Sequence, residues 1–420
     1  MTSLERRRMK RYQRRKTKRD EKKRAQYAEC DNFDNIISYR ALFSANRKSK
    51  KGVSWKASIQ RYQMNLLRNL ELTQNALEHG RDITKGFVEF DTMERGKLRH
   101  IRSIHYSERV VQRAACDVSL VPMLRRSLIY DNGACLPGKG IDQSLERFTA
   151  HLQKFYRANG FSNEGWAVLF DFSGFFDNIL HSCCFEIYNR AFSDQRIIWL
   201  LKCFVLPFGH SNGRKACRRV KQKNIMEGYT GKSLGLGSQI SQITAVAYPS
   251  AIDHYIKERL RIRFYGRYMD DGYMLFRTKE SAQKAIAGLR HLCSRLEIKV
   301  NEKKTRIVKI KHGIRFLKVK MTLTETGKVK RRMTRESIIR QRRKLKKFAV
   351  KVKKGEMTVE EAANSHASWE GHAIRRGGTQ AARKLDVLFY ELFGVHPPIC
   401  KIRKRRKRKW QKSRPKRCST

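Results

Sequence analysis

The stretch Tyr268-Met269-Asp270-Asp271 places two adjacent carboxylates between apolar runs. Residues 262–265 before it and 273–276 after it are short, aromatic and β-prone, which predicts the two strands of a hairpin with the acids at its tip. Adjacent carboxylates repel each other and Mg²⁺ prefers hard oxygen ligands, so the pair is typical of a metal site. A solvated Asp-Asp-Gly turn is the simpler interpretation of the same residues.

A third carboxylate, Asp171, follows the apolar run of residues 166–170. An Asp in this position is also an acceptable helix N-cap. A strand that ends at Asp171 could instead pair with the hairpin, which forms about a hundred residues later, across an intervening helical connection. The three carboxylates would then form a two-metal cluster of the kind that activates a 3′ hydroxyl and holds a triphosphate.

Segments around these acids resemble, in the same order, the motifs of reverse transcriptases from bacterial and phage retroelements. Residues 171–176 and 268–271 resemble motifs A and C, and the other similarities fall in residues 96–101, 107–112, 138–140, 296–305 and 313–317. Each motif alone is weak, but several in the family's order are specific. The resemblance covers residues 90–320. It implies an α+β fold of the right-hand polymerase type, with fingers, a palm with an antiparallel sheet and a helical thumb.

Residues 234–242 resemble motif B and lead into an expected helical stretch at 243–260. Most reverse transcriptases carry Gln-Gly and Ser-Pro here, whereas this chain has Leu236-Gly237 and Ser241-Gln242. The departure resembles the enzymes of diversity-generating retroelements, which copy a template-repeat RNA with errors at adenine beside a small basic accessory protein. An aliphatic side chain cannot make the hydrogen bonds of a glutamine, which would loosen nucleotide selection. A plain loop at a helix entry is the alternative.

The resemblance implies a role for each matching residue. Two Mg²⁺ ions, or Mn²⁺ in their place, would be held by the carboxylates of Asp171, Asp270 and Asp271 and by the backbone carbonyl of Phe172. Lys304 would act at the leaving pyrophosphate as a proton donor or a fixed positive charge. The incoming deoxynucleoside triphosphate would meet Lys97, Arg99, Phe176, Leu236, Gly237 and Gln242, and the primer grip would include Phe316 and Leu317.

Phe176 stands where the family has its aromatic steric gate, which leaves no space for the 2′ hydroxyl of a ribonucleotide. Ordinary core packing is the alternative, because alternation along a strand would point either Phe175 or Phe176 inward. Lys97 and Arg99 would neutralise triphosphate oxygens, Arg with bidentate geometry and Lys as a point charge.

The composition favours a protein that binds nucleic acid. The formal net charge is +56, from 94 Lys and Arg against 38 Asp and Glu, which predicts strongly salt-dependent binding to a polyanion. The expected partners are the template RNA, the duplex of RNA and cDNA, and deoxynucleoside triphosphates. Residues 6–24 and 401–417 are almost continuously basic, and we expect two arms that stay flexible until they meet a phosphate backbone. Neither arm carries enough apolar residues for an amphipathic membrane anchor.

The pattern along the chain predicts a basic N-terminal arm at 1–30, fingers at 31–165, a palm at 166–320, a helical thumb at 321–396 and a basic tail at 397–420. Helices are expected at 55–79, at 108–124 and within 333–393, where breaks are expected at Gly355, Gly371 and Gly377-Gly378. The polar loop at 209–228 has no role that the sequence reveals.

The ten cysteines show no paired C-x-x-C spacing, which indicates neither a zinc site nor a disulfide framework. No apolar region follows the basic start, as it would in a secretory signal, and no run is long enough to cross a membrane. The cytoplasm is therefore the expected location.

Other functions fit parts of this pattern. A polymerase of phage defence, of the abortive-infection type or a related type, with template-independent or protein-primed synthesis would share every catalytic residue, and only its product would separate it. A non-catalytic RNA-binding protein on a decayed palm is disfavoured, because decay rarely leaves Asp171, Asp270 and Asp271 together. A group II intron maturase is disfavoured because no Cys/His-rich endonuclease module follows Leu323.

Overall fold

The computed structural model describes residues 2–94, 96–210 and 229–398 and has an α+β fold. Its described residues divide into two compact units. The first unit draws on Met1–Gly140, Phe170–Gly272 and Ile286–Lys304, and the second on Ile141–Leu169, Tyr273–Ala285 and the chain from Thr305 onward. Each unit is thus assembled from segments that are far apart in the sequence.

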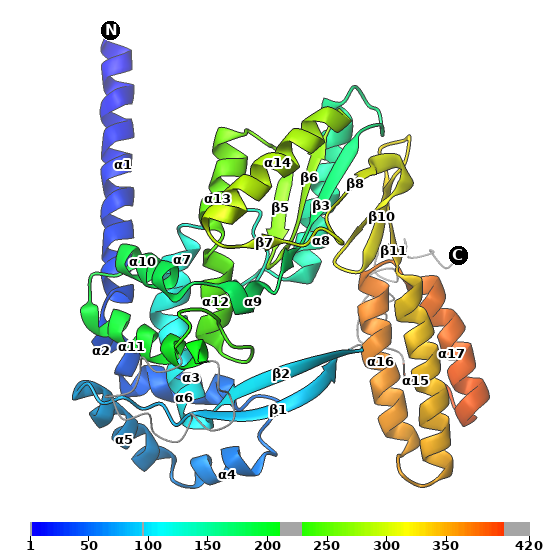
Figure 1. Cartoon of the computed structure of the whole chain (residues 1–420), viewed down its shortest axis with the longest axis horizontal. Coiled ribbons are helices and arrows are strands. Elements are labelled where there is room, and N and C mark those ends of the chain that lie inside the picture. The colour runs from blue at the N-terminus through cyan, green and yellow to red at the C-terminus, as the bar shows by residue number, and fades with distance from the viewer. Residues whose placement is uncertain (1, 95, 211–228, 399–420) are drawn as a thin grey trace, which may run out of the picture. The chain divides into compact units, whose positions relative to one another are not determined.

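The first unit is mainly helical (Figure 1). Its α-helices are α1 (Ser3–Cys30), α2 (Phe33–Ile37), α3 (Tyr39–Ser49), α4 (Ala57–Met64), α5 (Leu66–Glu78), α6 (Tyr106–Ala115), α7 (Val121–Arg125), α9 (Phe175–Asn178), α10 (His181–Ala191), α11 (Gln195–Val205), α12 (Gln239–Ala247) and α13 (Ser250–His254). A long hairpin pairs β1 (Phe87–Glu94) with β2 (Lys97–Ile104), with Phe87 opposite Ile104. No helix that the structure describes has both the length and the apolar character needed to cross a bilayer.

Three expected helices of this unit have different boundaries. The helix expected at 55–79 is interrupted at Asn65, whose side chain favours non-helical backbone, so α4 and α5 are separate. The helix expected at 108–124 is continuous, but it passes through a π-helical turn, Cys116–Leu120, between α6 and α7. The stretch expected at 243–260 begins earlier, at Gln239, and α12 ends before Pro249, which has no N–H to continue the helix.

The N-terminal segment is one long helix, and the expectation of a flexible arm was wrong. Thr2 and Glu5 form a capping box, in which the Thr2 N–H donates to the Glu5 carboxylate at 2.8 Å and the Glu5 N–H donates to the Thr2 hydroxyl at 3.3 Å. Lys, Arg, Gln and Glu are good helix formers, so propensity outweighs charge repulsion in α1. The basic tail from residue 399 onward lies outside the described residues, as do residues 211–228 of the polar loop.

A four-stranded sheet with the order β5-β6-β3-β8 underlies the acidic residues. Its strands are β3 (Trp166–Phe170), β5 (Tyr265–Tyr268), β6 (Asp271–Phe276) and β8 (Arg306–Lys309), and α14 (Lys279–Arg295) follows β6. β3 runs antiparallel to β8, with Trp166 opposite Lys309. The hairpin predicted around the two acids is confirmed, with Met269 and Asp270 as its turn and Asp271 as the first residue of β6, but its first strand is Tyr265–Tyr268 and not residues 262–265 as expected. A short pair, β4 (Phe172–Ser173) with β7 (Lys299–Val300), lies beyond Asp171.

The second unit contains α8 (Ile141–Ala158), a three-stranded sheet and three long helices (Figure 1). The sheet has the order β11-β10-β9, from β9 (Ile314–Phe316), β10 (Val319–Leu323) and β11 (Val329–Met333). The helices α15 (Arg335–Lys353), α16 (Val359–Arg375) and α17 (Thr379–Phe393) share a core of Leu345, Ala362, Leu385 and Phe389. The expected break at Gly371 was wrong, because α16 runs through it, whereas Gly355 and Gly377-Gly378 lie between helices.

A buried ion pair in the first unit holds the acidic hairpin. The side chains of Arg267 on β5 and Asp253 on α13 are both fully buried. Arg267 donates to the two oxygens of Asp253 from Nε at 2.8 Å and from Nη2 at 2.6 Å, which is bidentate geometry. It also donates to the carbonyls of Met269 at 2.7 Å and Val246 at 2.8 Å. One guanidinium therefore joins α12, α13 and the turn that carries Asp270.

We predict that Arg267→Ala lowers the free energy of unfolding by about 3–5 kcal/mol, because it leaves the buried Asp253 carboxylate without its cationic partner, although the Tyr265 hydroxyl still donates to it. Arg267→Lys keeps the charge but loses the bidentate contact, so its loss should be smaller. Urea unfolding followed by circular dichroism measures both variants. A native-like stability of Arg267→Ala would contradict the role of this ion pair.

Candidate active site

Gly272 allows the strand that carries Asp271 to lie close to the segment that carries Asp171. A Cβ atom built on Gly272 would lie 2.1 Å from the ring of Phe170, which no side chain could tolerate. Phe170 is the last residue of β3 and directly precedes Asp171, while Gly272 directly follows Asp271. The close approach of this backbone to the ring therefore sets Asp271 beside Asp171.

Asp171 is almost fully buried and is held by residues of the turn at 301–304. Lys304 Nζ lies 2.8 Å from both carboxylate oxygens, and Asn301 Nδ2 donates to Oδ1 at 3.0 Å. The backbone adds a further bond, because the Asn301 N–H donates to the Asp171 carbonyl at 2.7 Å. The pairing of Phe172 with Val300 brings these two distant segments together.

The hairpin acids are destabilised in their charged forms. Burial, together with repulsion from Asp171, raises the pKa of Asp270. The pKa of Asp271 rises to about 7, because burial and repulsion from Asp270 and Asp171 all disfavour its charge. Burial opposes the charge of Lys304, but its hydrogen bond to Asp171 and the attraction of all three acids raise its pKa. The site is a concentration of negative charge that a single ammonium group balances in part.

The chemistry of these donors fits a divalent cation. Hard carboxylate oxygens are the ligands that Mg²⁺ prefers, and a cation would relieve the repulsion that raises the pKa of Asp270 and Asp271. Within the part of the chain that the structure describes, however, no three His, Cys, Asp or Glu side chains already converge as metal ligands do. In this arrangement the ammonium of Lys304 contacts both oxygens of Asp171, and a metal ion would compete with it.

The two phenylalanines after Asp171 lie in α9, a single helical turn, and the expectation that they alternate along a strand was wrong. Gly174, with φ of 54°, ends the extended segment and starts this turn. Phe175 is buried, with 5% of its surface exposed, and Phe176 is partly exposed. The Phe176 carbonyl accepts the N–H of Leu234 at 2.8 Å, which brings the glycine-rich segment to the same place.

The glycine-rich segment is fixed at the start of α12. Ser238 caps this helix, and its hydroxyl donates to Gln112 Oε1 on α6 at 2.9 Å. A Cβ on Gly235 would overlap the Phe208 ring at 1.9 Å, and Gly237 has φ of 115°. Both positions therefore require glycine.

The residues predicted to contact the nucleotide from this segment are at least partly accessible. Leu236 is partly exposed, and Gly237 and Gln242 are exposed. Two further nucleotide-binding candidates lie on β2, where Arg99 is exposed opposite Thr92, and the side chain of Lys97 is not among those that the structure describes. The roles of all these residues toward a nucleotide stay predictions.

The predicted primer-grip residues lie in the second unit, at the hairpin of β9 and β10. Phe316 is buried and its ring contacts those of Phe148 and Tyr273, with centroids 5.4 and 5.0 Å away. Leu317 and Lys318 have φ of 47° and 64°, which is the two-residue turn typical of tight hairpins. Phe316 thus supports this hairpin from inside, and the partly exposed Leu317 lies at its turn.

Three residues of the site escaped the sequence analysis, namely Asn301, Gln112 and Arg267. Asn301 and Gln112 act through contacts with residues more than a hundred positions away, which no local pattern reports. Arg267 did carry a signal, because an Arg inside an apolar strand next to two acids must find a buried partner.

The chain matches a known protein family in sequence and is similar to a solved structure. The family model described as reverse transcriptase (RNA-dependent DNA polymerase) matches residues 96–321, which is more than half of the chain. No curated protein gives a significant match. Among solved structures, telomerase from Candida albicans in complex with a TWJ fragment of telomeric RNA is similar at 12% identity and a TM-score of 0.44. The match covers 68% of this chain and 55% of that one. On the evidence of the family model, this chain belongs to the reverse transcriptase family.

Proposed function

We propose that the protein is an RNA-directed DNA polymerase that copies a specific RNA template into cDNA. The observation that carries the proposal is the cluster of Asp171, Asp270 and Asp271 with Lys304, within a family of this activity. Burial and repulsion raise the pKa of both Asp270 and Asp271, so this cluster is costly to assemble, and clusters of this kind are found mainly at functional sites.

In the proposed mechanism, two Mg²⁺ ions, or Mn²⁺ in their place, would be held by Asp171, Asp270 and Asp271 and by the carbonyl of Phe172. The bound ions would activate the 3′ hydroxyl of the primer and neutralise the triphosphate. The ammonium group of Lys304 lies 2.8 Å from both carboxylate oxygens of Asp171. If this contact broke, Lys304 would be able to interact with the leaving pyrophosphate. Phe176 would lie beneath the incoming sugar and exclude a 2′ hydroxyl.

For the biological role, we propose the error-prone copying of a diversity-generating retroelement, with a small basic accessory protein as a further partner. Leu236 supports this proposal, because an apolar side chain stands where related enzymes carry Gln. The cytoplasm is the proposed location, and the cysteines among the described residues are all free thiols, as in a reducing compartment. A phage-defence polymerase with template-independent or protein-primed synthesis would use the same acids, and its product would identify it.

We predict that Asp270→Asn combined with Asp271→Asn reduces primer extension on RNA by about a hundredfold or more, because it removes charge that the transition state needs. The variant should fold as well as the native chain, since fewer buried negative charges repel each other. Extension of a labelled primer with Mg²⁺ measures the activity. Extension at the native rate would show that the assignment is wrong.

Replacing Phe176 with Val should raise ribonucleotide incorporation by about tenfold or more, because space opens where the 2′ hydroxyl would clash. The ratio of kcat/KM for a ribonucleotide and its deoxynucleotide measures the effect. Phe175→Ala is the matched control, since Phe175 is buried and should affect stability and leave this ratio unchanged. If only the Phe175 variant changed the ratio, the steric gate would be misplaced by one residue.

Leu236→Gln should lower misincorporation opposite template adenine, with smaller effects opposite the other bases. One restored hydrogen bond is worth on the order of 1 kcal/mol, so a change of several-fold is expected. Leu236→Met keeps an apolar side chain and should leave the error spectrum as it is. Sequencing of cDNA made with any accessory protein present measures these errors. A native error spectrum that is flat across the four bases would contradict the diversity-generating role, but not the polymerase assignment.

A further inference from the structure

Helix α1 is an exposed, strongly basic rod that the proposed chemistry does not use. Its 28 residues span about 42 Å and contain 13 Lys and Arg against 4 Asp and Glu. Every described side chain from Ser3 to Lys22 is exposed to solvent. No described carboxylate forms an ion pair with the basic groups between Arg6 and Lys22. The charge of this helix is therefore available to a partner.

The basic residues of α1 form a continuous stripe along one face. Arg7, Arg11, Arg14, Lys18 and Lys22 follow one another at intervals of four, three, four and four residues. Residues at these intervals lie above one another on a helix, about 5–6 Å apart. Like charges at this spacing repel, so the stripe weakens the isolated helix. A row of closely spaced anions bound along α1 would neutralise this repulsion and stabilise the helix.

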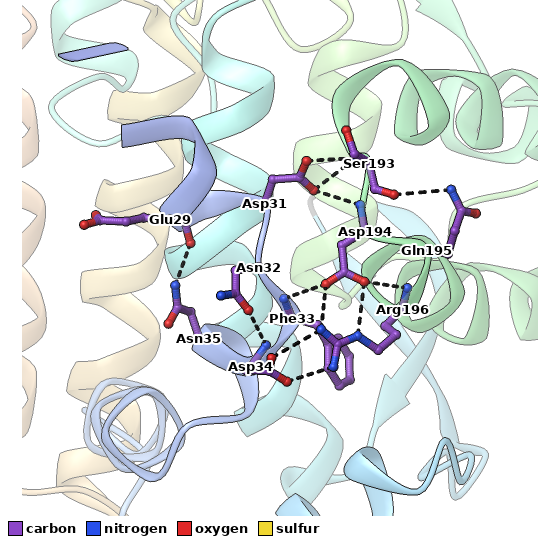
Figure 2. A network of polar contacts seen from close by, with 10 residues as sticks. All are labelled: Glu29, Asp31, Asn32, Phe33, Asp34, Asn35, Ser193, Asp194, Gln195 and Arg196. Carbon is purple, nitrogen blue, oxygen red and sulfur yellow. Dashed lines mark hydrogen bonds and ion pairs between the residues drawn. The ribbon is translucent and has the colours of Figure 1, made fainter. Parts of the chain in front are cut away.

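The base of α1 is clamped to the rest of the first unit, as Figure 2 shows. Asp31, which follows the helix, accepts the backbone N–H groups of Ser193 at 2.9 Å and Asp194 at 3.1 Å. Asp194 in turn accepts the N–H of Phe33 at 3.0 Å. Arg196 donates to Asp194 at 3.1 Å and so closes the network.

Two further contacts tighten the clamp. Arg196 also donates to Asp34 at 2.8 Å, and the Arg126 guanidinium lies 3.2 Å from the ring centroid of Tyr27, within the last turns of α1. Burial alone would raise the pKa of Asp194, but hydrogen bonds from Arg196 and Phe33 outweigh it and lower that pKa, so the carboxylate stays charged near neutral pH. The rod is thus fixed at one end, and its basic stripe has a defined direction relative to the helices around α11.

We propose that α1 is a docking arm for base-paired RNA, a stem within the RNA that the protein copies. A straight rod with a regular basic stripe matches the regular phosphate rows of a double helix. Proteins recognise A-form RNA stems by shape and by phosphate contacts, without reading the bases. Since it takes the nucleic acid to be RNA, this inference rests on the proposed function.

Other occupants fit α1 less well. Proteins hold single strands by stacking bases on aromatic side chains, but α1 offers only Tyr12, because Tyr27 is covered by Arg126. A membrane surface would need an apolar face, and among the described side chains of α1 only Leu4, Met9 and Tyr12 are large, apolar and exposed. The contacts that fix the C-terminal end of α1 also favour a rigid partner, because a fixed, straight helix cannot adapt its shape to a flexible single strand.

The test compares two variants that each replace three basic residues of α1 with Gln, which keeps helix propensity high. The stripe variant changes Arg11, Arg14 and Lys18. The matched control removes the same charge from Arg6, Lys16 and Arg19, none of which lies three or four positions from Arg11, Arg14 or Lys18. Equal thermal unfolding of the two full-length variants would show that both keep the fold.

Binding is measured with an RNA hairpin whose stem has about 16 base pairs, with unpaired RNA of equal length, and with the DNA duplex of the same sequence. At about 0.15 M salt the stripe variant should bind the stem about tenfold more weakly than the native chain, and the control within about threefold. The slope of log K against log salt should become less steep by on the order of 3 for the stripe variant, since three phosphate contacts with a duplex are lost.

An equal loss of affinity for the stem in both variants would overturn the proposal, because binding would then depend on net charge and not on where the charge lies on the helix. A larger loss for unpaired RNA or for DNA than for the stem would overturn it as well. Since binding and not polymerisation is measured, a protein without polymerase activity could still confirm the docking arm, so this inference and the proposed function can fail separately.

Discussion

The buried contact between Arg267 and Asp253 is the interaction on which the acidic site depends. The turn at Met269 and Asp270 has a left-handed residue, Met269 with φ of 56°, and the guanidinium holds the carbonyl of that residue at 2.7 Å. The same group binds α12 through Val246 and α13 through Asp253. A buried pair of this kind adds little net stability, but it permits only one arrangement of the elements that it joins. Fixed geometry is what an active site needs.

Electrostatics explains why the acids and Lys304 occur together. Burial and mutual repulsion raise the pKa of Asp271 to about 7, so part of the protein population carries a proton there at neutral pH. Binding of a cation would release that proton, so apparent metal affinity should increase as the pH rises through this range. Lys304 offsets part of the repulsion through its contact with both carboxylate oxygens of Asp171.

Local patterns predicted the parts of the site that neighbouring residues determine. The hairpin at Tyr268–Asp271 and the strand that ends before Asp171 followed from apolar runs around isolated acids. The prediction of a flexible N-terminal arm was wrong, because it considered only the density of positive charge. The residues of α1 also have high helix propensity, and Thr2 and Glu5 form a capping box. The helical turn at Phe175 and Phe176 was missed because Gly174 ends the extended segment after one short pair. The contacts of Asn301 and Gln112 could not be predicted, since they join segments more than a hundred residues apart.

The contact of Gly272 with the Phe170 ring has a consequence for how this chain can vary. The separation of Asp171 and Asp271 is set by the pairing of β3 with β6 and by the packing of the Phe170 ring against Gly272, and not by the length of chain that connects the two acids. The chain between Asn178 and Phe264 can therefore gain or lose segments away from Leu234, Val246 and Asp253, which hold the two acidic segments, without changing the distance between the acids. A protein built in this way can acquire new surface features between its sequence motifs while its cluster of acids keeps the same dimensions.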